Sequence, residues 1–192
     1  MSSSAGQRPG RLIILSGPSG VGKDTVIRRL LEIAPELRRP VAFTTRAPRP
    51  GEVDGRDYSF VGEPEFLAMR DAGQFLETAV VHGNRYGTAR ARVDELRRQG
   101  QDVLLKIDVQ GAAQLRKQGL DGCFIFLAPP SPDVLRARLR RRQTESPEEL
   151  AVRTHDAETE MAEAANYHHV VVNDQVERAA AEIAQIVRSW PG

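Results

Sequence analysis

A glycine-rich run near the amino terminus has the residue types and spacing needed to hold a phosphate group. The run Gly17-Pro18-Ser19-Gly20-Val21-Gly22-Lys23 follows the apolar segment Leu12-Ile13-Ile14-Leu15 and precedes an amphipathic helical pattern. In this strand-loop-helix context the glycines let backbone N–H groups turn inward around an anion, and the helix N-terminus adds its positive dipole. Lys23 would then reach the β- and γ-phosphates of a nucleoside triphosphate, which we expect to be ATP. The alternative is a glycine-rich turn that binds no ligand.

The residue after Lys23 departs from the usual pattern of a phosphate loop. A serine or threonine that ligates Mg²⁺ is expected there, whereas this chain has Asp24 followed by Thr25. A carboxylate oxygen suits a hard cation such as Mg²⁺, so Asp24 is a candidate metal ligand, although its charge would also repel the phosphates. The predicted ATP-binding loop comprises Gly17, Pro18, Ser19, Gly20, Val21, Gly22, Lys23, Asp24 and Thr25.

Alternating strand and helix patterns surround this loop and predict an α/β fold. Four short apolar runs separate the helical stripes, and their near-continuous apolarity is typical of parallel strands that helices cover on both faces. We therefore expect a parallel sheet flanked by helices. The four runs are Leu12–Leu15, Val103–Leu105, Phe124–Leu127 and Val170–Val172.

Two segments interrupt this alternation. Residues 41–90 are rich in proline and glycine and have shorter, more alternating apolar segments, which predict a small mixed-β insertion with one helix near Glu65–Asp71. A second, highly charged insertion runs from about Leu139 to Glu149. Two insertions on one core indicate parts that move over a site.

Composition excludes several other classes of protein. The 192 residues contain 27 basic and 26 acidic side chains, and a formal charge of +1 is too balanced to favour nucleic-acid binding through bulk charge. The sequence has no apolar run long enough to span a membrane and no apolar segment typical of a secretory signal. The one cysteine, Cys123, excludes an internal disulfide and fits a reducing cytoplasm, where we expect the protein. The pattern favours neither a monomer nor a homo-oligomer.

Further motifs, taken with the phosphate loop, resemble the guanylate kinase family over essentially the whole chain beyond the first ten residues. The most specific is Thr44-Thr45-Arg46-Ala47-Pro48-Arg49-Pro50-Gly51-Glu52. The other matching segments are Gly55–Tyr58, Phe75–Glu77, Gly83–Thr88, Ile107–Gly111, Ala128–Ser131 and Val172–Asp174.

This resemblance implies a P-loop NTPase-type kinase that catalyses ATP + GMP ⇌ ADP + GDP, uses Mg²⁺ and also accepts dGMP. It would supply a step toward GTP and dGTP. The expected organisation is a disordered leader (1–10) and one domain (11–192), whose core comprises residues 11–40, 91–138 and 154–192. The GMP-binding insertion would be 41–90 and the arginine-rich lid 139–153.

The resemblance assigns the phosphate of GMP to the first insertion. Arg46 and Arg49 are three residues apart and offer two forked guanidinium groups to a dianion. Taken alone, the pair could equally be solvated loop charges. The family's tyrosines that hydrogen-bond this phosphate correspond to Tyr58 and Tyr86.

Base recognition falls, by the same resemblance, to Glu77, with Thr88 and Asp108 at further positions along the base edge. Guanine presents N1–H and N2–H₂ as adjacent donors that one carboxylate can accept, whereas adenine presents an acceptor at N1. The plainer alternative for Glu77 is a surface acid at a strand end. The family usually has a serine where this chain has Ala42, so one contact to guanine is expected to be missing.

In the lid, Arg138, Arg142 and Arg153 fall on the family's catalytic positions. Cations that converge on the moving phosphoryl group supply most of the catalysis in such a transfer. A basic run of this kind is otherwise a solubility face or a patch that binds RNA. Asn173 lies on the family's adenine side. The predicted catalytic set is Lys23, Arg46, Arg138, Arg142 and Arg153.

Two other functions are each compatible with part of this pattern. A non-catalytic protein-binding module related to guanylate kinases characteristically lacks the phosphate loop or the clamp arginines, whereas this chain has both. A P-loop kinase for another phosphorylated acceptor would not need Glu77 together with Tyr58 and Tyr86. The kinase that acts on GMP is therefore the preferred interpretation.

Asp24 and Lys106 both differ in charge from the residues usual at their positions, and this gives a first testable prediction. The family usually has an acid where Lys106 stands, and we hypothesise that this lysine compensates for Asp24 beside the phosphates. In a double-mutant cycle, Asp24→Ser and Lys106→Asp should each lower kcat/KM, and the double variant should lose less than the two losses combined. Losses that simply add would refute the pairing.

Overall fold

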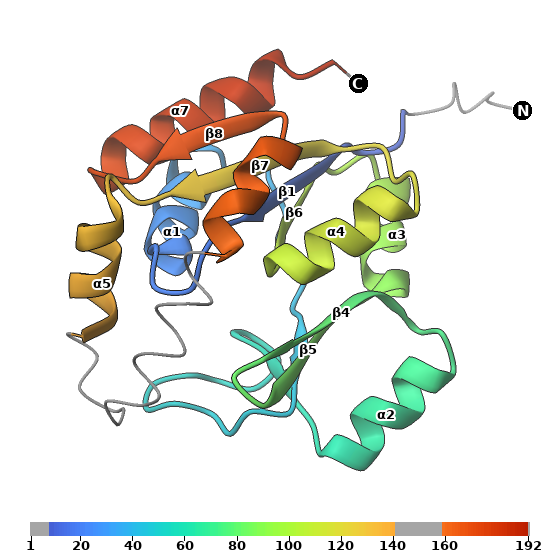
Figure 1. Ribbon diagram of the computed structural model, residues 1–192. Coiled ribbons are helices and arrows are strands. Elements are labelled where there is room, and N and C mark those ends of the chain that lie inside the picture. Colours follow the sequence, from blue (N-terminus) through green and yellow to red (C-terminus); the bar gives the residue numbers. More distant parts are fainter. Residues whose placement is uncertain (1–7, 141–158, 192) are drawn as a thin grey trace, which may run out of the picture. The chain divides into compact units, whose positions relative to one another are not determined.

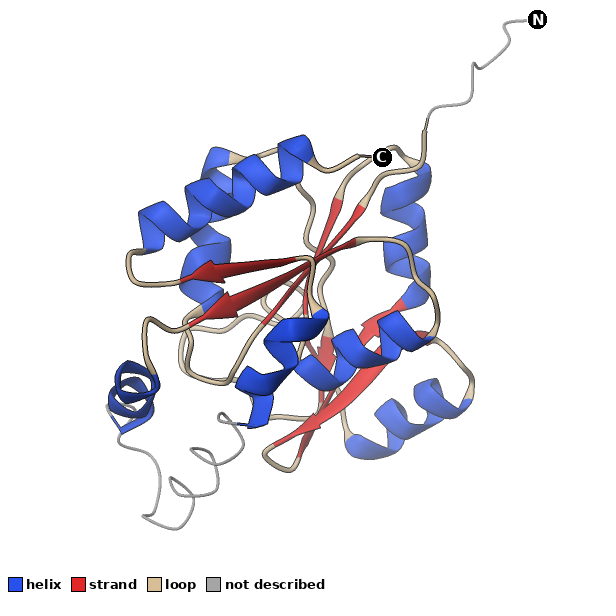
Figure 2. Cartoon of the chain, turned by 45° about the horizontal axis from the view of Figure 1, so that its top comes forward, coloured by secondary structure: helices blue, strands red, loops and turns tan. Residues whose placement is uncertain are grey.

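The computed structural model describes residues 8–140 and 159–191, and it confirms the α/β class (Figure 1). All four apolar runs form strands, and the chain contains both helices and strands, which Figure 2 distinguishes by colour. The described chain divides into two compact units. Of the described residues, unit 1 comprises 8–12 and 37–121, and unit 2 comprises 13–36, 122–140 and 159–191. The predicted division into leader, core, insertion and lid stays a prediction, and most of the lid lies outside the described residues.

Unit 2 is built on parallel strands in the order β1-β7-β8. Ile13 of β1 is paired with Cys123 of β7, and Ile125 of β7 with His169 of β8. Helices α1 and α7 pack side by side (Figure 1). The elements are β1 (Leu12–Ser16), α1 (Lys23–Ile33), β7 (Cys123–Ala128), α5 (Pro132–Arg140), the short 3-10 helix η1 (Glu163–Asn166), β8 (His169–Val172) and α7 (Val176–Ser189).

Burial in these strands follows their place in the sheet. Every residue of β1 and β7 is buried, as the apolar runs predict. The expectation that β8 is covered on both faces was wrong, because only Val171 is buried while Val170 and Val172 are exposed. Strand β8 is the last strand of its sheet in the described part of the chain, and such a strand can leave one face in water.

Unit 1 contains a second sheet, with the strand order β3-β2-β5-β4. Strand β5 runs antiparallel to both β2 and β4, and β2 runs parallel to β3, so the predicted mixed-β segment is confirmed. The predicted helix near residue 65 is α2. The elements of this unit are β2 (Phe43–Thr44), β3 (Ser59–Phe60), α2 (Glu63–Asp71), β4 (Phe75–Val81), β5 (Asn84–Ala89), α3 (Arg90–Arg98), β6 (Val103–Lys106) and α4 (Val109–Lys117).

An aromatic cluster fixes α2 on this sheet. The rings of Phe66 and Phe75 stack with centroids 4.6 Å apart, and Phe43 meets Phe75 edge-on at 5.8 Å. Gly87 leaves the space for them, because a Cβ there would lie 2.9 Å from the Phe75 ring. Such contacts bury large apolar areas and hold the short strands of this sheet in register.

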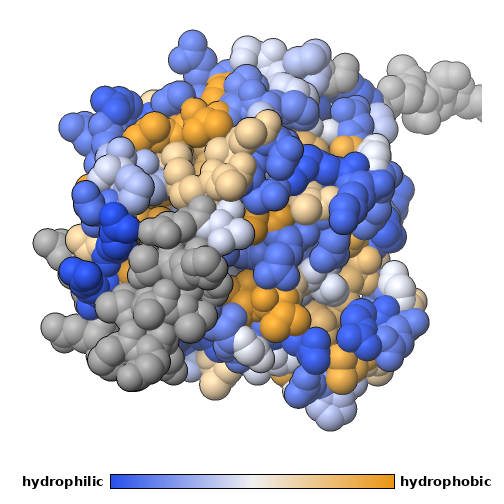
Figure 3. All heavy atoms as spheres, viewed as in Figure 1, coloured by the Kyte–Doolittle hydropathy of each residue, from blue (hydrophilic) through white to orange (hydrophobic). Residues whose placement is uncertain are grey.

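Exposed large apolar side chains are few in the described residues: Val53, Val80, Val170 and Val172. On the face drawn in Figure 3, hydrophilic residues predominate and hydrophobic ones lie in small groups between them. None of the described helices has the length and apolarity needed to cross a membrane.

An ion pair fixes the start of the described chain within unit 1. Asp102 accepts hydrogen bonds from the backbone N–H of Arg11 at 2.7 Å and from its guanidinium at 2.6 and 3.0 Å. The two side chains are only 17% and 15% exposed. Burial alone would raise the pKa of Asp102, but the hydrogen bonds and charge of Arg11 outweigh it and hold the pKa below the ordinary 3.8.

We expect Asp102→Asn to lower the free energy of unfolding by about 1 to 2 kcal/mol near neutral pH. A lowered folded-state pKa contributes stability above the unfolded-state pKa and loses it as the pH falls through the folded-state value. The difference between wild type and variant should therefore shrink below about pH 4 in urea titrations. Asp71→Asn, in the exposed pair with Arg70, is the control and should change stability little. An equal effect of the two substitutions would contradict the prediction.

Candidate active site

The glycine-rich loop lies between the end of β1 at Ser16 and the start of α1 at Lys23. Gly20 and Gly22 have φ values of 81° and 99°, in the left-handed region that glycine adopts at no steric cost. Gly17 also lies close to β7, since a Cβ there would be 2.3 Å from the Leu127 carbonyl oxygen. The loop therefore has the tight backbone turn that the phosphate-binding prediction requires.

The loop already binds charged groups of the chain itself. The backbone N–H of Ser19 donates to a carboxylate oxygen of Glu160 at 3.0 Å, so this amide is turned toward an anion. Lys23 Nζ donates to the carbonyl oxygens of Gly17 and Pro18 at 2.5 and 3.1 Å, which places the ammonium over the loop. An anion-facing amide and a lysine over the same loop are the two parts of a phosphate site.

Arg138 and Asn173 brace the far end of this loop. Arg138 donates to the backbone oxygens of Val21 and Asn173, both at 3.0 Å, and Asn173 Nδ2 donates to Val21 at 2.7 Å. Asn173 is 3% exposed, and its Oδ1 is buried without a hydrogen-bond donor among the described residues. A buried amide oxygen of this kind is costly unless a donor reaches it.

The structure describes the predicted metal ligand Asp24 but only one of the three predicted lid arginines, Arg138. Asp24 and Thr25 are exposed in the first turn of α1, directly after the loop lysine. One carboxylate next to a phosphate site fits Mg²⁺, which binds through one or two carboxylates and otherwise through phosphate oxygens and water. Arg142 and Arg153 lie outside the described residues.

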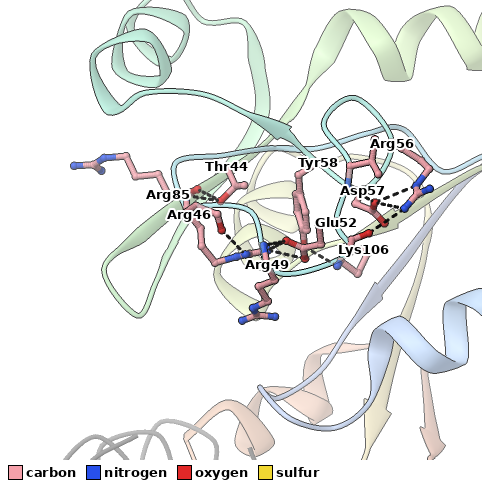
Figure 4. Close-up of polar contacts among 12 residues, drawn as sticks. Thr44, Arg46, Arg49, Glu52, Arg56, Asp57, Tyr58, Arg85 and Lys106 are labelled. Atoms are coloured by element: carbon pink, nitrogen blue, oxygen red, sulfur yellow. Dashed lines mark hydrogen bonds and ion pairs between the residues drawn. The ribbon is translucent and has the colours of Figure 1, made fainter. Parts of the chain in front are cut away.

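In unit 1, a bidentate ion pair holds Arg46 of the predicted phosphate clamp (Figure 4). Arg46 Nη2 donates to both carboxylate oxygens of Glu52, at 2.8 and 2.9 Å, and its guanidinium lies 5.6 Å from the Tyr58 ring centroid. Burial opposes the charge on Arg46, but hydrogen bonds to Glu52 and Tyr86 outweigh burial and raise its pKa. The guanidinium is therefore charged and fixed in position.

Glu52 also holds the second arginine of the clamp through its backbone. Its carboxylate accepts the backbone N–H of Arg49 at 2.7 Å, and its own N–H donates to the Arg49 carbonyl at 3.0 Å. The Arg49 side chain itself is exposed. Glu52 belongs to the same motif as the two arginines, but no spacing or residue pattern in that motif predicts this positioning role.

Lys106 contacts a predicted substrate tyrosine of the same unit. Its Nζ donates to the Tyr58 hydroxyl at 2.6 Å and lies 4.8 Å from the ring centroid, and Figure 4 shows the two side chains meeting. Since an ammonium cannot accept, the hydroxyl oxygen is the acceptor and its hydrogen is left for another group. Tyr86 lies edge-on to Tyr58, with centroids 5.9 Å apart. The pairing of Lys106 with Asp24, which belongs to unit 2, stays a prediction.

Glu77 is the buried carboxylate of unit 1. It is 5% exposed on β4, opposite Thr88 of β5, whose hydroxyl donates to Glu77 Oε1 at 2.7 Å. Burial is the main cause that raises its pKa from 4.5 to about 7; hydrogen bonds from Thr88 lower it, and the charge of Asp108 raises it further. The alternative of a surface acid at a strand end was therefore wrong.

Two further residues complete this part of the site. Asp108 is the N-cap of α4 and accepts the Gln110 backbone N–H at 2.9 Å. Ala42 lines a small pocket together with Tyr58, Thr88 and Lys106. The family usually has a serine at this position, so here a methyl group takes the place of a hydroxyl beside two predicted substrate residues, Tyr58 and Thr88.

Each unit thus collects one predicted set of residues. Unit 1 holds the set predicted for GMP, and unit 2 holds the loop and the other described residues predicted for ATP. The set in unit 1 is Arg46, Arg49, Tyr58, Glu77, Tyr86, Thr88 and Asp108.

Comparison with known proteins identifies the relatives of this chain. A guanylate kinase family model matches residues 9–190. A curated guanylate kinase of Geobacter sulfurreducens is 46% identical over 181 residues, which cover 94% of this chain and 89% of the relative. One from Nocardia farcinica is 49% identical over 181 residues, covering 93% and 94%. A crystal structure of guanylate kinase from Anaplasma phagocytophilum is similar with a TM-score of 0.78 at 34% identity, over 95% of this chain and 86% of that one.

The raised pKa of Glu77 predicts a stability effect with a defined sign. A carboxyl group whose folded-state pKa is about 7 favours folding at low pH, and this contribution is lost as the pH rises from 4.5 through 7. Glu77→Gln should therefore raise the free energy of unfolding by about 1 to 3 kcal/mol near pH 8 and by little near pH 5. Urea unfolding at both pH values measures the difference, and a pH-independent effect would contradict the titration of Glu77.

Proposed function

The chain belongs to the guanylate kinase family and is an ATP:GMP phosphotransferase, and we propose that unit 1 binds GMP while the phosphate loop of unit 2 binds ATP with Mg²⁺. The observation that carries the assignment of sites is the buried carboxylate of Glu77, in the same unit as the braced guanidinium of Arg46. One group suits a base with two adjacent donors, and the other suits a phosphate.

Guanine selectivity follows from burying Glu77. Its carboxylate would accept N1–H and N2–H₂ of guanine together, and Thr88 already occupies one lone pair of Oε1. Adenine would place the N1 acceptor against the carboxylate and leave Thr88 as the main donor to a buried charge, which is strongly unfavourable. The two donors of guanine would favour the ionised form of Glu77 over the protonated form. Binding of the base therefore offsets the free-energy cost of burying this charge.

The phosphate of GMP would lie on the fixed clamp. Arg46 would turn toward the dianion the guanidinium donor that now bonds to the Ala47 carbonyl at 2.6 Å, while Glu52 holds the other side of the group. The exposed Arg49 side chain would close on the dianion from the same loop. Tyr58 would give its remaining hydroxyl hydrogen to a phosphate oxygen, since Lys106 holds the hydroxyl oxygen as an acceptor. Tyr86 would contact the same phosphate beside Arg46.

On the ATP side, Lys23 would exchange its two loop carbonyls for β- and γ-phosphate oxygens. The buried Oδ1 of Asn173 would accept a hydrogen bond from the exocyclic amino group of adenine. Asp24 would hold Mg²⁺, which neutralises charge on the phosphates when it is bound. Arg138, Arg142 and Arg153 would stabilise the transferring phosphoryl group as GMP attacks the γ-phosphorus and ADP leaves.

We also infer the wider role of the reaction. The proposed contacts are made to the base edge and the phosphate, which GMP and dGMP share, so both would be substrates. Their products, GDP and dGDP, lead to GTP and dGTP. The single, buried Cys123 is consistent with action in a reducing cytoplasm. The presence of both Lys23 in the phosphate loop and Arg46 in the first insertion disfavours the non-catalytic alternative.

A coupled ADP-release assay with ATP and each of GMP, dGMP, AMP, UMP and CMP tests the substrate assignment. We expect GMP and dGMP to support turnover and AMP to have a kcat/KM at least about a thousandfold lower, because a site built on hydrogen bonds rejects a base that leaves it unpaired. Equal turnover of AMP and GMP would overturn the role of Glu77.

Two matched arginine variants tie that activity to the proposed site. Arg46→Gln should lower kcat/KM for GMP by about a hundredfold or more, because a charged, bidentate donor is lost. Arg70→Gln, on α2 and paired with Asp71 at the surface, should stay within about twofold of wild type. Equal losses in the two variants would contradict the clamp.

A further inference from the structure

Helix α4 is joined to strand β4 by a row of glutamine side chains. Gln114 makes two bonds with Thr78: its Nε2 donates to the Thr78 carbonyl at 2.6 Å, and its Oε1 accepts the Thr78 N–H at 3.1 Å. Gln110 Nε2 donates to the carbonyl of Val80 at 3.2 Å, and Gln118 Nε2 to that of Leu76 at 3.3 Å. The row therefore follows β4 over five residues.

The geometry of helix and strand explains why the row stays in register. Four residues advance a helix by about 6 Å, and two residues advance a strand by about 6.6 to 6.8 Å. Glutamines spaced four apart on one helix face thus meet every second residue of β4, in the opposite direction of the chain. Strand β4 is the last strand of its sheet in the described part of the chain, so these amides occupy the edge where a further strand would pair.

Gln114 is the strongest of the three contacts because it satisfies both backbone groups of one residue. It copies the donor and acceptor pair that a neighbouring strand would present to Thr78. It is half-buried, whereas Gln110 and Gln118 are exposed and make one longer bond each. Thr78 directly follows Glu77, so fixing its peptide groups fixes the backbone from which the buried carboxylate projects.

Gly111 limits the Glu77 side chain from the same helix. It is buried in the first turn of α4, and a Cβ at this position would lie 2.3 Å from Glu77 Oε2 and 3.1 Å from its carboxyl carbon. Any larger residue would push the carboxylate away from its bond with Thr88. Helix α4 thus holds both the strand and the carboxylate.

We propose that Gln114 and Gly111 are positioning residues for guanine selectivity, which set where the Glu77 carboxylate meets the base. This inference rests on the proposed role of Glu77. A carboxylate that must accept two adjacent donors needs both oxygens in the plane of the base, and a small displacement loses one of the two bonds. Neither residue touches the substrate in this assignment, because each acts through Glu77.

The test is steady-state kinetics of Gln114→Leu and Gly111→Ala with GMP, AMP and ATP varied separately. We expect KM for GMP to rise by about tenfold or more and the ratio of kcat/KM for GMP over AMP to fall by a similar factor. KM for ATP should stay within about twofold, because unit 2 residues bind it in the proposal. A role in stability alone would lower the active fraction, and hence kcat, while both KM values stayed unchanged.

Control and rescue variants make the outcomes distinct. Gln110→Leu removes one exposed bond at Val80, three residues from Glu77, and should leave both KM values within about twofold of wild type. Gln114→Glu keeps the size and the acceptor but loses the donor, so it should fold where the leucine variant fails and show the same selective change in KM for GMP. If Glu77→Gln raises KM for GMP while Gln114→Glu, Gln114→Leu and Gly111→Ala do not, this inference is overturned and the proposed role of Glu77 stands. If Glu77→Gln has no effect either, both are overturned.

Discussion

A carboxyl group buried with few donors is the constraint on which the proposed GMP site of unit 1 depends. Glu77 is 5% exposed, and Thr88 is its main hydrogen-bond partner within the chain. Burying a charge without sufficient donors is strongly unfavourable, so the pKa of this group rises to about 7 and the acid is only partly ionised near neutral pH. Such a group is poorly suited to stabilising the fold. It is well suited to a ligand that brings its own donors, and guanine does.

The two units differ in the groups that would bind an anion in the proposed sites. The proposed ATP site of unit 2 consists of backbone amides, a helix N-terminus and the Lys23 ammonium, which suit a phosphate chain whatever base it carries. In the proposed clamp of unit 1, another side chain fixes the orientation of one forked guanidinium group, since Glu52 holds Arg46. A carboxylate that neutralises part of the arginine's charge weakens its attraction for phosphate, but it also removes the conformational freedom that binding would otherwise cost.

Local motifs explain why the loop, the clamp and Glu77 could be predicted from the sequence. Each lies in a short run where residue type, spacing and neighbouring strand agree, and the family resemblance supplied the roles. The alternation of strands and helices was predictable for the same reason, whereas the exposure of Val170 and Val172 depends on the place of β8 in its sheet. Apolar runs do not encode that place. The hydroxyl of Tyr58 as partner of Lys106 likewise joins residues 48 positions apart, with no periodic signal between them.

The role of α4 shows most clearly what sequence patterns leave out. Glutamines four residues apart on a helix are ordinary surface residues, and nothing in their spacing indicates that a strand edge lies opposite. Once β4 is placed there, the same spacing becomes a set of backbone partners, and a glycine in the first turn becomes the space for a carboxylate. If Glu77 reads the base as proposed, base recognition involves more than the residues that touch the base. In that assignment Gln114 and Gly111 of α4, which make no substrate contact, set whether Glu77 forms two hydrogen bonds or one, and selectivity between purines depends on that difference.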